Sequence, residues 1–348
     1  MAVRGPVGVA LVGTGLAGAM HAAGLRITPE ARLLGACGTS AERSAAFAAR
    51  LSLPRTYADL DALLSDPDVR VVHLCTPPHT HPGLTARIAA AGRHLLVDKP
   101  LARTTAEADA MLATCEAAGV LLGGLFQHRF IPLCRRAKEA VDGGLLGRIH
   151  LVDTVVKWWR EPAYYAGSSW RARRATEGGG ALINQAIHSI DLLQWLAGPV
   201  VSVAGHTATA LHRIETEDLG VAVMRTAMGA LGVIEGTTAA YPGFPERIEL
   251  HGSRGSLVLN EGERRLEWYL RGEAPRVEQE GRAQGNAADP AAVSPEAHAA
   301  AFGDFLRAVR DGGRPAVDGR EARRALAVVE AIYRSAEAGG APVAVELT

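Results

Sequence analysis

The feature that most constrains the fold of this 348-residue chain is a glycine-rich hexapeptide, GTGLAG, at residues 13–18. It directly follows the apolar run from Val7 to Val12 and opens a segment of helical period. In such a strand, turn and helix, the first glycine permits the tight turn, the second lets backbone approach a pyrophosphate, and the third lets helix and strand pack closely. The amides of the first helical turn are then free to bind the anion. The hexapeptide therefore predicts a dinucleotide-binding unit.

This hexapeptide heads an alternation of short apolar runs and longer segments of helical period that extends to about residue 125. The predicted strands are Val7–Val12, Arg32–Cys37, Val69–Cys75, His94–Val97 and Val120–Gly124. The predicted helices cover 16–26, 41–50, 80–91 and 104–118. Nearly uniform apolar strands are typical of a parallel sheet that helices cover on both faces. We therefore predict an α/β fold whose N-terminal domain, residues 1–127, is a Rossmann doubly wound parallel sheet.

From Ile131 onward, strand-like runs follow one another with few helices between them. These runs are Ile149–Trp159, Val200–Ala210, Leu219–Met224, Ala230–Thr238, Glu246–His251, Ser256–Asn260 and Arg264–Tyr269. Helices are predicted over 132–142, 180–197, 295–310 and 319–338, and the polar stretch 271–290 is interpreted as a hairpin tip or a mobile loop. Consecutive strands favour antiparallel pairing. The second domain, residues 128–348, should therefore be α+β with a large, mostly antiparallel open sheet, and its late helices could pack back on the first domain.

The composition argues against several classes of partner. Lys and Arg together number 37, as do Asp and Glu, so the chain has no net charge with which to hold nucleic acid or anionic lipid. Cys37, Cys75, Cys115 and Cys134 form no CxxC pair, which favours neither disulfides nor a zinc site. The apolar residues 7–20 resemble a secretory signal only loosely, because glycines interrupt them. We expect a cytoplasmic protein with no nucleic-acid and no membrane partner.

The end of the second predicted strand bears on the choice of cofactor. An acidic residue there would accept hydrogen bonds from the ribose of NAD and repel the 2′-phosphate of NADP. The chain instead has Thr39 and Ser40, with Arg43 one helical turn further on. Two hydroxyls and a guanidinium can hold a 2′-phosphate through charge-assisted hydrogen bonds, although Thr39 and Glu42 also match a capping box that leaves Arg43 in solvent. We predict NADP as the preferred cofactor and keep NAD as the alternative.

Lysine is rare in this chain, since only Lys99, Lys138 and Lys157 occur among 37 basic residues. Arginine serves where a cation merely has to be solvated or paired, whereas the lysine ammonium is compact and its pKa can fall on burial. Lys99 follows the apolar run of the fourth predicted strand, at the carboxyl edge of the parallel sheet, where ligands bind in such folds. We therefore expect Lys99 to take part in the reaction and interpret Lys138 as a surface residue. Lys157 could have either role.

A second group of polar residues lies in the run EGGGALINQAIHSIDLLQWLAG, residues 177–198. Asn184, His188, Asp191 and Trp195 recur at helical spacing and share one face of an otherwise apolar helix. A polar stripe of this kind either meets a ligand or is satisfied by core hydrogen bonds or an oligomer interface. The three glycines before it would let a substrate approach bare backbone. Asn184 and His188 are therefore candidates for the site.

Four motifs resemble, in order, those of the family of glucose-fructose oxidoreductase and inositol dehydrogenase, the Gfo/Idh/MocA family: GTGLAG at 13–18, CTPPHTH at 75–81, GRHLLVDKP at 92–100 and GGGALINQAIHSIDLLQW at 178–195. The resemblance covers essentially the whole chain. It implies hydride transfer between NAD(P) and a hydroxyl-bearing carbon of a sugar or polyol, in a homodimer or homotetramer formed through the C-terminal sheet. It also implies that Lys99 is the lysine of the family's Glu-Lys-Pro motif, here preceded by Asp98, and that His188 is the catalytic histidine. Asn184 stands where many members carry aspartate.

Removal of hydride from an alcohol carbon requires that the hydroxyl proton also leaves, so a base must lie within hydrogen-bond reach. We assign this role to His188 and expect Lys99 to bind the same oxygen and stabilise the developing alkoxide. The amide of Asn184 cannot stabilise an imidazolium by charge, so His188 should be less basic than it would be beside aspartate. Lys99 therefore stays open as the alternative proton-transfer group.

The expected site residues fall into three groups, and some rest on the resemblance alone. The catalytic candidates are Lys99, His188 and Asn184. The cofactor-binding candidates are Gly13, Thr14, Gly15, Leu16, Ala17, Gly18, Gly38, Thr39, Ser40, Arg43, Thr76, Pro77, His81, Asp98 and Lys99, of which 38–43 is also similar to the segment of NADP-using relatives. The substrate-binding candidates are Lys99, Gln127, Arg129, Lys157, Tyr165, Trp170, Arg171, Asn184 and His188. No metal is expected, because the histidine spacing matches no zinc pattern and hydride transfer needs none.

Together these features predict an NAD(P)-dependent dehydrogenase or reductase of a sugar, polyol or glycoside. One alternative is an enzyme that keeps its nicotinamide tightly bound and recycles it within one turnover, as in redox-assisted glycoside chemistry. The other is a sugar- or dinucleotide-sensing protein on the same fold without chemistry. The presence of both Lys99 and His188, and the lack of a DNA-binding helix pair in the sequence, argue against the second.

Overall fold

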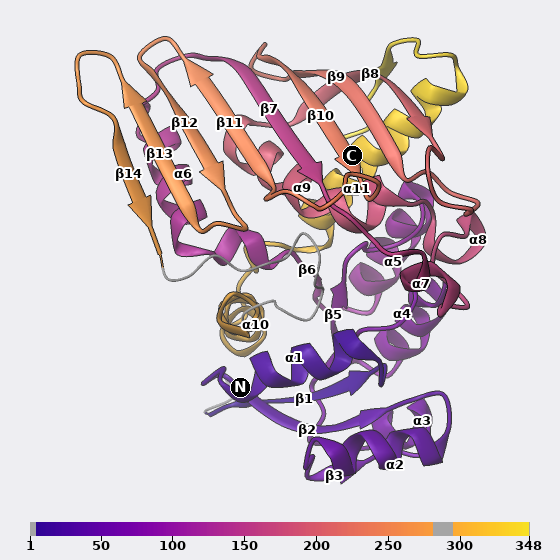
Figure 1. The fold of residues 1–348 in the computed structure, drawn as a ribbon. Helices are drawn as coiled ribbons and strands as arrows, with labels where there is room; N and C mark the ends of the chain where they lie inside the picture. Colours follow the sequence, from indigo (N-terminus) through magenta and orange to yellow (C-terminus); the bar gives the residue numbers. More distant parts are fainter. Residues whose placement is uncertain (1–4, 281–294, 348) are drawn as a thin grey trace. The chain divides into compact units, whose positions relative to one another are not determined.

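The computed structural model describes residues 5–280 and 295–347, which form two compact units. Unit 1 contains residues 5–127 together with 295–323, and unit 2 contains residues 128–280 together with 324–347. Each unit is built around one sheet, and Figure 1 labels the elements of both.

Unit 1 is built around a parallel six-stranded sheet with the strand order β3-β2-β1-β4-β5-β6. The strands are β1 (Val7–Val12), β2 (Ala31–Cys37), β3 (Arg55–Thr56), β4 (Val71–Leu74), β5 (His94–Asp98) and β6 (Leu122–Leu125). The helices are α1 (Leu16–Arg26), α2 (Ala41–Arg50), α3 (Leu60–Leu64), α4 (His81–Ala90), α5 (Thr105–Ala117) and α10 (Pro295–Asp311), with a 3₁₀ turn η1 (Pro78–Thr80). The strand order reverses between β1 and β4, which is the doubly wound arrangement. The predicted Rossmann sheet is confirmed, and β3 and α3 are additional to the prediction.

Every residue of β1 and β4 is buried, because helices cover both faces of the sheet. The apolar residues 7–20, which loosely imitate a secretory signal, form β1 and the first half of α1. Among residues 5–280 and 295–347, no helix combines the length and apolarity that crossing a bilayer requires.

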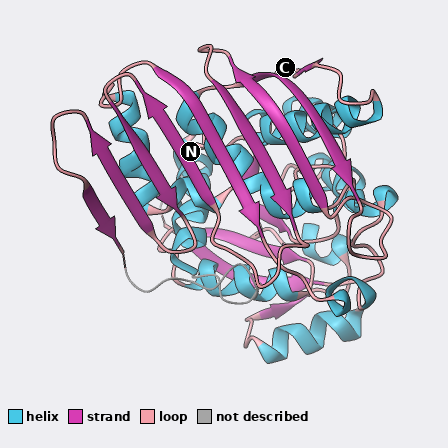
Figure 2. Cartoon of the chain, turned by 45° about the horizontal axis from the view of Figure 1, so that its top comes forward, coloured by secondary structure: helices cyan, strands magenta, loops and turns pink. Residues whose placement is uncertain are grey.

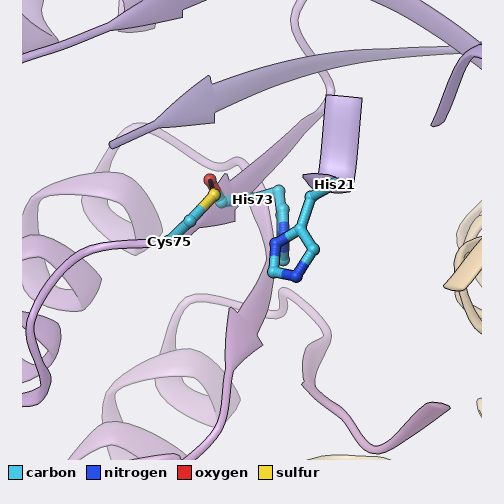
Figure 3. Close-up of side chains that lie close together, drawn as sticks. All are labelled: His21, His73 and Cys75. Carbon is cyan, nitrogen blue, oxygen red and sulfur yellow. Dashed lines mark hydrogen bonds between the residues drawn. The ribbon is translucent and has the colours of Figure 1, made fainter. Parts of the chain in front are cut away.

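Buried histidines fill part of the core between this sheet and helices α1 and α10. His73 on β4 and His21 on α1 share a 2.8 Å hydrogen bond between Nε2 and Nδ1, and Nδ1 of His73 lies 2.9 Å from the Leu96 carbonyl oxygen. A carbonyl only accepts, so His73 donates from Nδ1 and His21 donates to His73. Burial lowers the pKa of His73 to about 3 and also lowers the pKa of His21, so both rings are neutral. Figure 3 shows the two rings beside Cys75.

Unit 2 is built around a nine-stranded sheet with the order β14-β13-β12-β11-β7-β10-β9-β8-β15. The strands are β7 (Ile149–Lys157), β8 (Val200–Ala208), β9 (Leu219–Thr226), β10 (Leu231–Thr237), β11 (Arg247–Gly252), β12 (Gly255–Asn260), β13 (Arg265–Leu270), β14 (Arg276–Gln279) and β15 (Val343–Ala344). All neighbours pair antiparallel except β7 and β10, which are parallel. The predicted open, mostly antiparallel sheet is confirmed. The interpretation of 271–290 as a loop is wrong for β14, and its residues 281–290 lie outside the described part of the chain.

Helices cover only one face of this sheet. They are α6 (Pro132–Asp142), a π-helix η3 (Leu182–Ala186), α9 (Ile187–Ala197) and the C-terminal part of α11 (Gly319–Glu337), while η2 (Gln127–Phe130), α7 (Pro162–Ala166) and α8 (Arg174–Glu177) are short connecting elements. Side chains therefore alternate along each strand: Val152 and Val156 of β7 are buried beneath α9, whereas Leu151 faces away from it and is exposed. In residues 5–280 and 295–347, no helix covers the opposite face of the sheet, which is called the bare face below (Figure 2).

Candidate active site

The phosphate loop connects β1 to α1, and its three glycines are required for different reasons. Gly13 has a φ of +122°, and a Cβ at this position would lie 2.4 Å from the Cys75 carbonyl oxygen. A Cβ on Gly18 would lie 2.4 Å from the Gly13 carbonyl oxygen, whereas a Cβ on Gly15 would meet no atom within 4 Å. Gly13 and Gly18 therefore serve the fold. Gly15 borders open space at the N-terminus of α1, which is the space that a pyrophosphate requires.

The rest of the loop is accessible from solvent. Leu16 is exposed, and Thr14 and Ala17 are half-buried. Thr14 also contacts the loop after β2, since a Cβ on Gly38 would lie 2.9 Å from Thr14 Oγ1. The two loops that should hold the phosphate and ribose groups of the cofactor thus lie side by side at one edge of the sheet.

The cap of α2 differs from the predicted capping box of Thr39 and Glu42. Ser40 is the N-cap, and its Oγ accepts a 3.3 Å hydrogen bond from the Arg43 amide. The difference arises because the helix begins one residue later than that box requires. Thr39 is left exposed at the end of β2, and the Arg43 side chain is exposed on the first turn of α2.

The loops after β4 and β5 are tied together by His81. Its ring is buried, and its two nitrogens lie 2.9 Å from the Thr76 carbonyl oxygen and 3.1 Å from the Leu101 carbonyl oxygen. The expectation that His81 contacts the cofactor is therefore not supported, because backbone carbonyls occupy both nitrogens. Thr76 and Pro77 remain at the mouth of the loop, where Thr76 Oγ1 shares a 2.7 Å hydrogen bond with Thr80 Oγ1.

Lys99 directly follows β5, at the same carboxyl edge of the sheet as the phosphate loop, and its side chain is half-buried. The Asp98 carboxylate accepts a 2.9 Å hydrogen bond from the Lys99 amide, and the Lys99-Pro100 peptide bond is cis. Asp98 thus shapes the backbone from which the Lys99 side chain departs.

In unit 2, the helix that carries His188 begins irregularly. The predicted helix over 180–197 is interrupted at its start by the π-helix η3, which leads into α9. Single π turns inside helices occur frequently at functional sites. The buried carboxylate of Glu217 fixes this start: it accepts hydrogen bonds from Gly180 N (2.9 Å), Leu182 N (3.0 Å) and the Tyr333 hydroxyl (2.8 Å). Burial raises the pKa of Glu217, although these donors oppose the shift.

The glycines before η3 are required by this packing. A Cβ on Gly179 would lie 2.1 Å from the Tyr333 hydroxyl oxygen, and a Cβ on Gly180 would lie 1.9 Å from the Glu217 carbonyl oxygen. The expectation that they expose backbone to a substrate is wrong for these two positions. They instead let Tyr333 and Glu217 approach the backbone.

Asn184 lies within η3, and a buried carboxylate orients it. Its Nδ2 donates to Glu177, whose other carboxylate oxygen accepts from the Ala172 amide. Glu177 is only 2% exposed. The carboxyl group of Glu177 therefore lies directly beside the amide of Asn184.

His188 is the second residue of α9 and is stacked against another imidazole. The rings of His128 and His188 lie 4.4 Å apart and are inclined by only 14°. His128 Nδ1 forms an ion pair with the buried Glu261, and the nearby Glu246 is also buried. Burial lowers the pKa of His128, but the Glu261 carboxylate outweighs this and raises it overall. Burial, with repulsion from Glu261, raises the pKa of Glu246. The imidazole of His188 is thus stacked on a histidine that is itself ion-paired with a buried carboxylate.

Arg129, which the sequence predicted to contact substrate, is buried and bound to a carboxylate. Its guanidinium makes two hydrogen bonds to Asp191 of α9, at 2.7 and 2.6 Å, and it is 5% exposed. It also lies 5.8 Å over the Trp195 ring, as does Lys138. The polar face predicted for this helix is thus partly explained by these contacts, which hold α9 to η2.

Lys157 lies away from α9, and the contact of Gln127 with substrate stays a prediction. Lys157 belongs to the bare face of the sheet, opposite to α9, and lies 3.3 Å from Glu235 on β10. Alternation along β7 places Lys157 on this face, because Val156 faces the helices. Gln127 is buried at the end of the first part of unit 1.

Tyr165, Trp170 and Arg171, which are predicted to bind substrate, all lie in the segment between β7 and η3. The Tyr165 hydroxyl shares a 2.7 Å hydrogen bond with Thr238 Oγ1, and burial raises the pKa of Tyr165 to about 12. The Arg171 guanidinium lies 4.8 Å over the Trp170 ring and 4.6 Å over that of Tyr164.

The structure therefore assembles the predicted residues in two sets, one in each unit. Unit 1 brings together the phosphate loop, the end of β2 and Lys99, and unit 2 brings together Asn184, His188 and the aromatic group. Glu177, Glu217 and Glu261, which hold these residues in place, are not among the site residues predicted from the sequence. Only Glu177 had a local signal, since it stands next to the glycine run.

This combination defines an oxidoreductase: a Rossmann unit with an open phosphate loop, and a second unit with an oriented histidine. Residues 7–125 match the model of the oxidoreductase family with an NAD-binding Rossmann fold, and residues 134–258 match the GFO/IDH/MocA C-terminal domain. The chain therefore belongs to the Gfo/Idh/MocA family, as its motifs predicted.

Similar proteins support this assignment along the chain. The structure of the WlbA dehydrogenase from Bordetella pertussis, in complex with NADH and UDP-GlcNAcA, is 31% identical, with a TM-score of 0.88 over 99% of both chains. Levoglucosan dehydrogenase in complex with NADH and levoglucosan is 25% identical, with a TM-score of 0.88 over 99% of this chain and 100% of that chain. Myo-inositol 2-dehydrogenase from Thermotoga maritima is 29% identical over 72% of this chain and 75% of its own length.

Proposed function

We propose that this protein is an NAD(P)-dependent dehydrogenase or reductase of a sugar or polyol. The observation that carries the proposal is the placement of Lys99 at the same sheet edge as a phosphate loop with open space at Gly15. The relatives add the substrate class, since inositol and levoglucosan, named for two of them, are both rich in hydroxyls.

Within this proposal, His188, Lys99 and Asn184 each have a separate role. Hydride transfer would be supplied by a bound nicotinamide, and the side chains of the protein would take up or return the proton. His188, whose ring is held by stacking on the ion-paired His128, takes the hydroxyl proton. Lys99, in unit 1, would hydrogen-bond a substrate oxygen and stabilise the negative charge that develops on it. Asn184, oriented by Glu177, is available to hold a second substrate hydroxyl.

For the cofactor we propose a preference for NADP. Thr39 and Arg43 are exposed at the end of β2 and the start of α2, and the capping of α2 by Ser40 leaves the Arg43 guanidinium in solvent. Residues 37–41, at and directly after the end of β2, include no acidic residue that would repel a 2′-phosphate. In fluorescence titrations NADPH should bind more tightly than NADH, and Arg43→Ala should narrow the difference while Arg50→Ala, at the end of the same helix, should not. Tighter binding of NADH by the wild type would overturn this preference.

The proposed function is tested by a screen of sugars and polyols, with nicotinamide absorbance as the readout and both cofactors in each arm. Lys99→Ala should lower kcat by at least about 10²-fold, the usual scale for a group that assists proton transfer, with cofactor affinity nearly unchanged. Lys138→Ala is the matched control, because Lys138 pairs with Asp142 on the surface of α6. Unchanged turnover in Lys99→Ala would remove this lysine from the mechanism, and the absence of turnover with every sugar and polyol would contradict the proposal as a whole.

A further inference from the structure

Unit 2 contains a pocket of about 700 Å³, a volume within the usual range of roughly 300–1,000 Å³ for ligand sites. It lies among α7, the turn before α8 and the segment after β8. The lining residues that carry the argument are Trp159, Tyr165, Arg171, Arg173, His212 and Arg213. No role for this pocket follows from the proton-transfer chemistry above.

The pocket is joined to the helix that carries His188 through one carboxylate. Ala172, which lines the pocket, has a φ of +56°, an uncommon left-handed conformation for a residue with a Cβ. The Ala172 amide is held there by Glu177, which also holds Asn184. Strained backbone of this kind is often retained at functional sites. Here it lies between Arg171 and Arg173, both of which line the pocket.

The charge of the pocket wall is positive. Arg171, Arg173 and Arg213 contribute three guanidinium groups, and Glu215 is the one carboxylate among the lining residues. Within residues 5–280 and 295–347, none of these three arginines forms an ion pair. The Arg171 Nε is shielded from solvent and has no hydrogen-bond partner within the same ranges. A buried guanidinium N–H without a partner is costly, so this group favours a ligand with acceptor oxygens.

Fixed aromatic rings complete the pocket. The His212 ring lies 5.0 Å from that of Tyr165 and 5.9 Å from that of Trp159. Thr238 anchors two of these rings, through its hydroxyl to Tyr165 and through its carbonyl oxygen, 3.2 Å from His212 Nε2. Because these rings are held, their apolar faces are available to the C–H groups of a sugar ring, while the arginines face its polar substituents.

We propose that this pocket binds an anionic group, a carboxylate or a phosphate ester, carried by the sugar that the enzyme oxidises or reduces. Planar guanidinium groups bind both anions through paired, charge-assisted hydrogen bonds. The inference rests on the proposed function, because it adds an acidic substituent to a sugar substrate. It predicts that the preferred substrates are sugar acids or sugar phosphates rather than neutral hexoses.

The test is calorimetric titration of the full-length protein, with a nicotinamide cofactor present, in matched series of D-glucose, D-galactose and D-mannose. Each series contains the neutral sugar, its uronate and its 6-phosphate, so the carboxylate and phosphate arms are read separately. At least one acidic arm should bind about tenfold or more tightly than the neutral sugar of its series. The double variant Arg173→Gln/Arg213→Gln should lose that advantage while the affinity for the neutral sugar changes less than about twofold.

Arg171→Gln should act in the same direction, but Arg171 is stacked between aromatic rings, so the two exposed arginines give the decisive variant. Arg271→Gln, at an exposed turn of unit 2 remote in sequence from the pocket, is the matched control and should behave as the wild type. Equal affinity for acidic and neutral sugars, or no measurable binding of any, would overturn the proposal. Preferential binding of an acidic sugar without turnover would leave the pocket assignment intact and contradict the proposed function instead.

Discussion

Gly13 and Gly15 lie two residues apart in one loop, yet a methyl group at each should have different effects. Gly15→Ala adds a Cβ in open space, so the free energy of unfolding should change by less than about 0.5 kcal/mol while NADPH binding weakens by about tenfold or more. Gly13→Ala places a Cβ against the Cys75 carbonyl oxygen, at a residue with a positive φ. This variant should lower the free energy of unfolding by about 1–3 kcal/mol or more. Urea unfolding and fluorescence titration measure the two effects.

The control is built into the pair, since each variant serves as the reference for the other. Wild-type affinity for NADPH in Gly15→Ala would contradict the assignment of this loop to the pyrophosphate. Wild-type stability in Gly13→Ala would contradict the packing of the loop against Cys75.

Asn184 and Glu177 form a second pair at the residue scale. Asn184→Asp places two carboxylates within hydrogen-bond distance in a buried setting, so one of them must retain a proton. The variant should lose about 1–3 kcal/mol of unfolding free energy at neutral pH. Adding Glu177→Gln restores one amide and one carboxylate and should recover most of that loss. Urea unfolding of the two single variants and the double variant gives the coupling, and strictly additive effects would show that the two side chains do not interact.

At the scale of elements, the bare face of the nine-stranded sheet is the most unusual surface of unit 2. Val221 and Val223 of β9 and Leu231 of β10 lie on it and are 42%, 59% and 51% exposed. Apolar side chains gathered on one sheet face are typical of an interaction surface. We propose that copies of this chain associate through it, as a homodimer or homotetramer.

Val223→Glu should therefore shift the mass measured by light scattering toward the monomer, because each copy would bury an unpaired charge at the interface. The control is Leu145→Glu, because Leu145 is an exposed apolar residue between α6 and β7. Val258→Glu cannot serve as the control, since Val258 lies on the same face of the sheet as Val223. A wild-type monomer at micromolar concentration would exclude association through this face.

The elements also show what the sequence could and could not predict. Strands such as β1, β7 and β9 were predictable because apolar runs or strict alternation span them. Helix α3, with five residues, and strand β3, with two, are too short for a periodic signal. The π turn before α9 could not be predicted either, because it depends on Glu217 and Tyr333, which are distant in sequence and meet the helix only in the folded unit.

Some of the site residues could also be predicted from the sequence, and others could not. Local motifs located the phosphate loop and Lys99, since each follows a strand directly. The role of Arg129 was not predictable, because its partner Asp191 lies 62 residues further along the chain. Likewise, Lys157 lies on the bare face because the side chains of β7 point alternately to the two faces of the sheet. Which of them point toward the helices is decided by the packing of α9.

At the scale of the whole molecule, the two units should respond to pH in opposite ways. In unit 1, burial lowers the pKa values of His21, His73, His81 and His94 below the unfolded value of about 6.5. The unfolded state therefore binds more protons below that pH, and unit 1 should lose up to about 1.4 kcal/mol per pH unit for each such histidine as the pH falls. In unit 2, Glu261 raises the pKa of His128 above the unfolded value. The stabilisation of unit 2 by protonated His128 is therefore complete below about pH 6.5 and is lost as the pH rises through the raised pKa.

Hydrogen exchange measured by mass spectrometry, corrected for intrinsic rates, resolves the two units in one sample. Peptides from β4 should be less protected at about pH 5.5 than at pH 7.5, and peptides from α9 should show a smaller change or the reverse. His73→Leu should flatten the response of β4 and leave α9 unaffected. A common shift of both peptides in the same direction and to the same extent would show that the units unfold as one.

One feature of unit 1 affects how the protein is made. Helix α10 supplies Phe302 and Phe305, which are buried against Gly24 and Gly123 of the Rossmann unit, yet it is encoded after nearly all of unit 2. At about 5–20 residues per second, a ribosome therefore synthesises all six strands of the first sheet many seconds before it synthesises α10. The N-terminal domain, although it is translated first, therefore cannot complete its core until α10 has been synthesised.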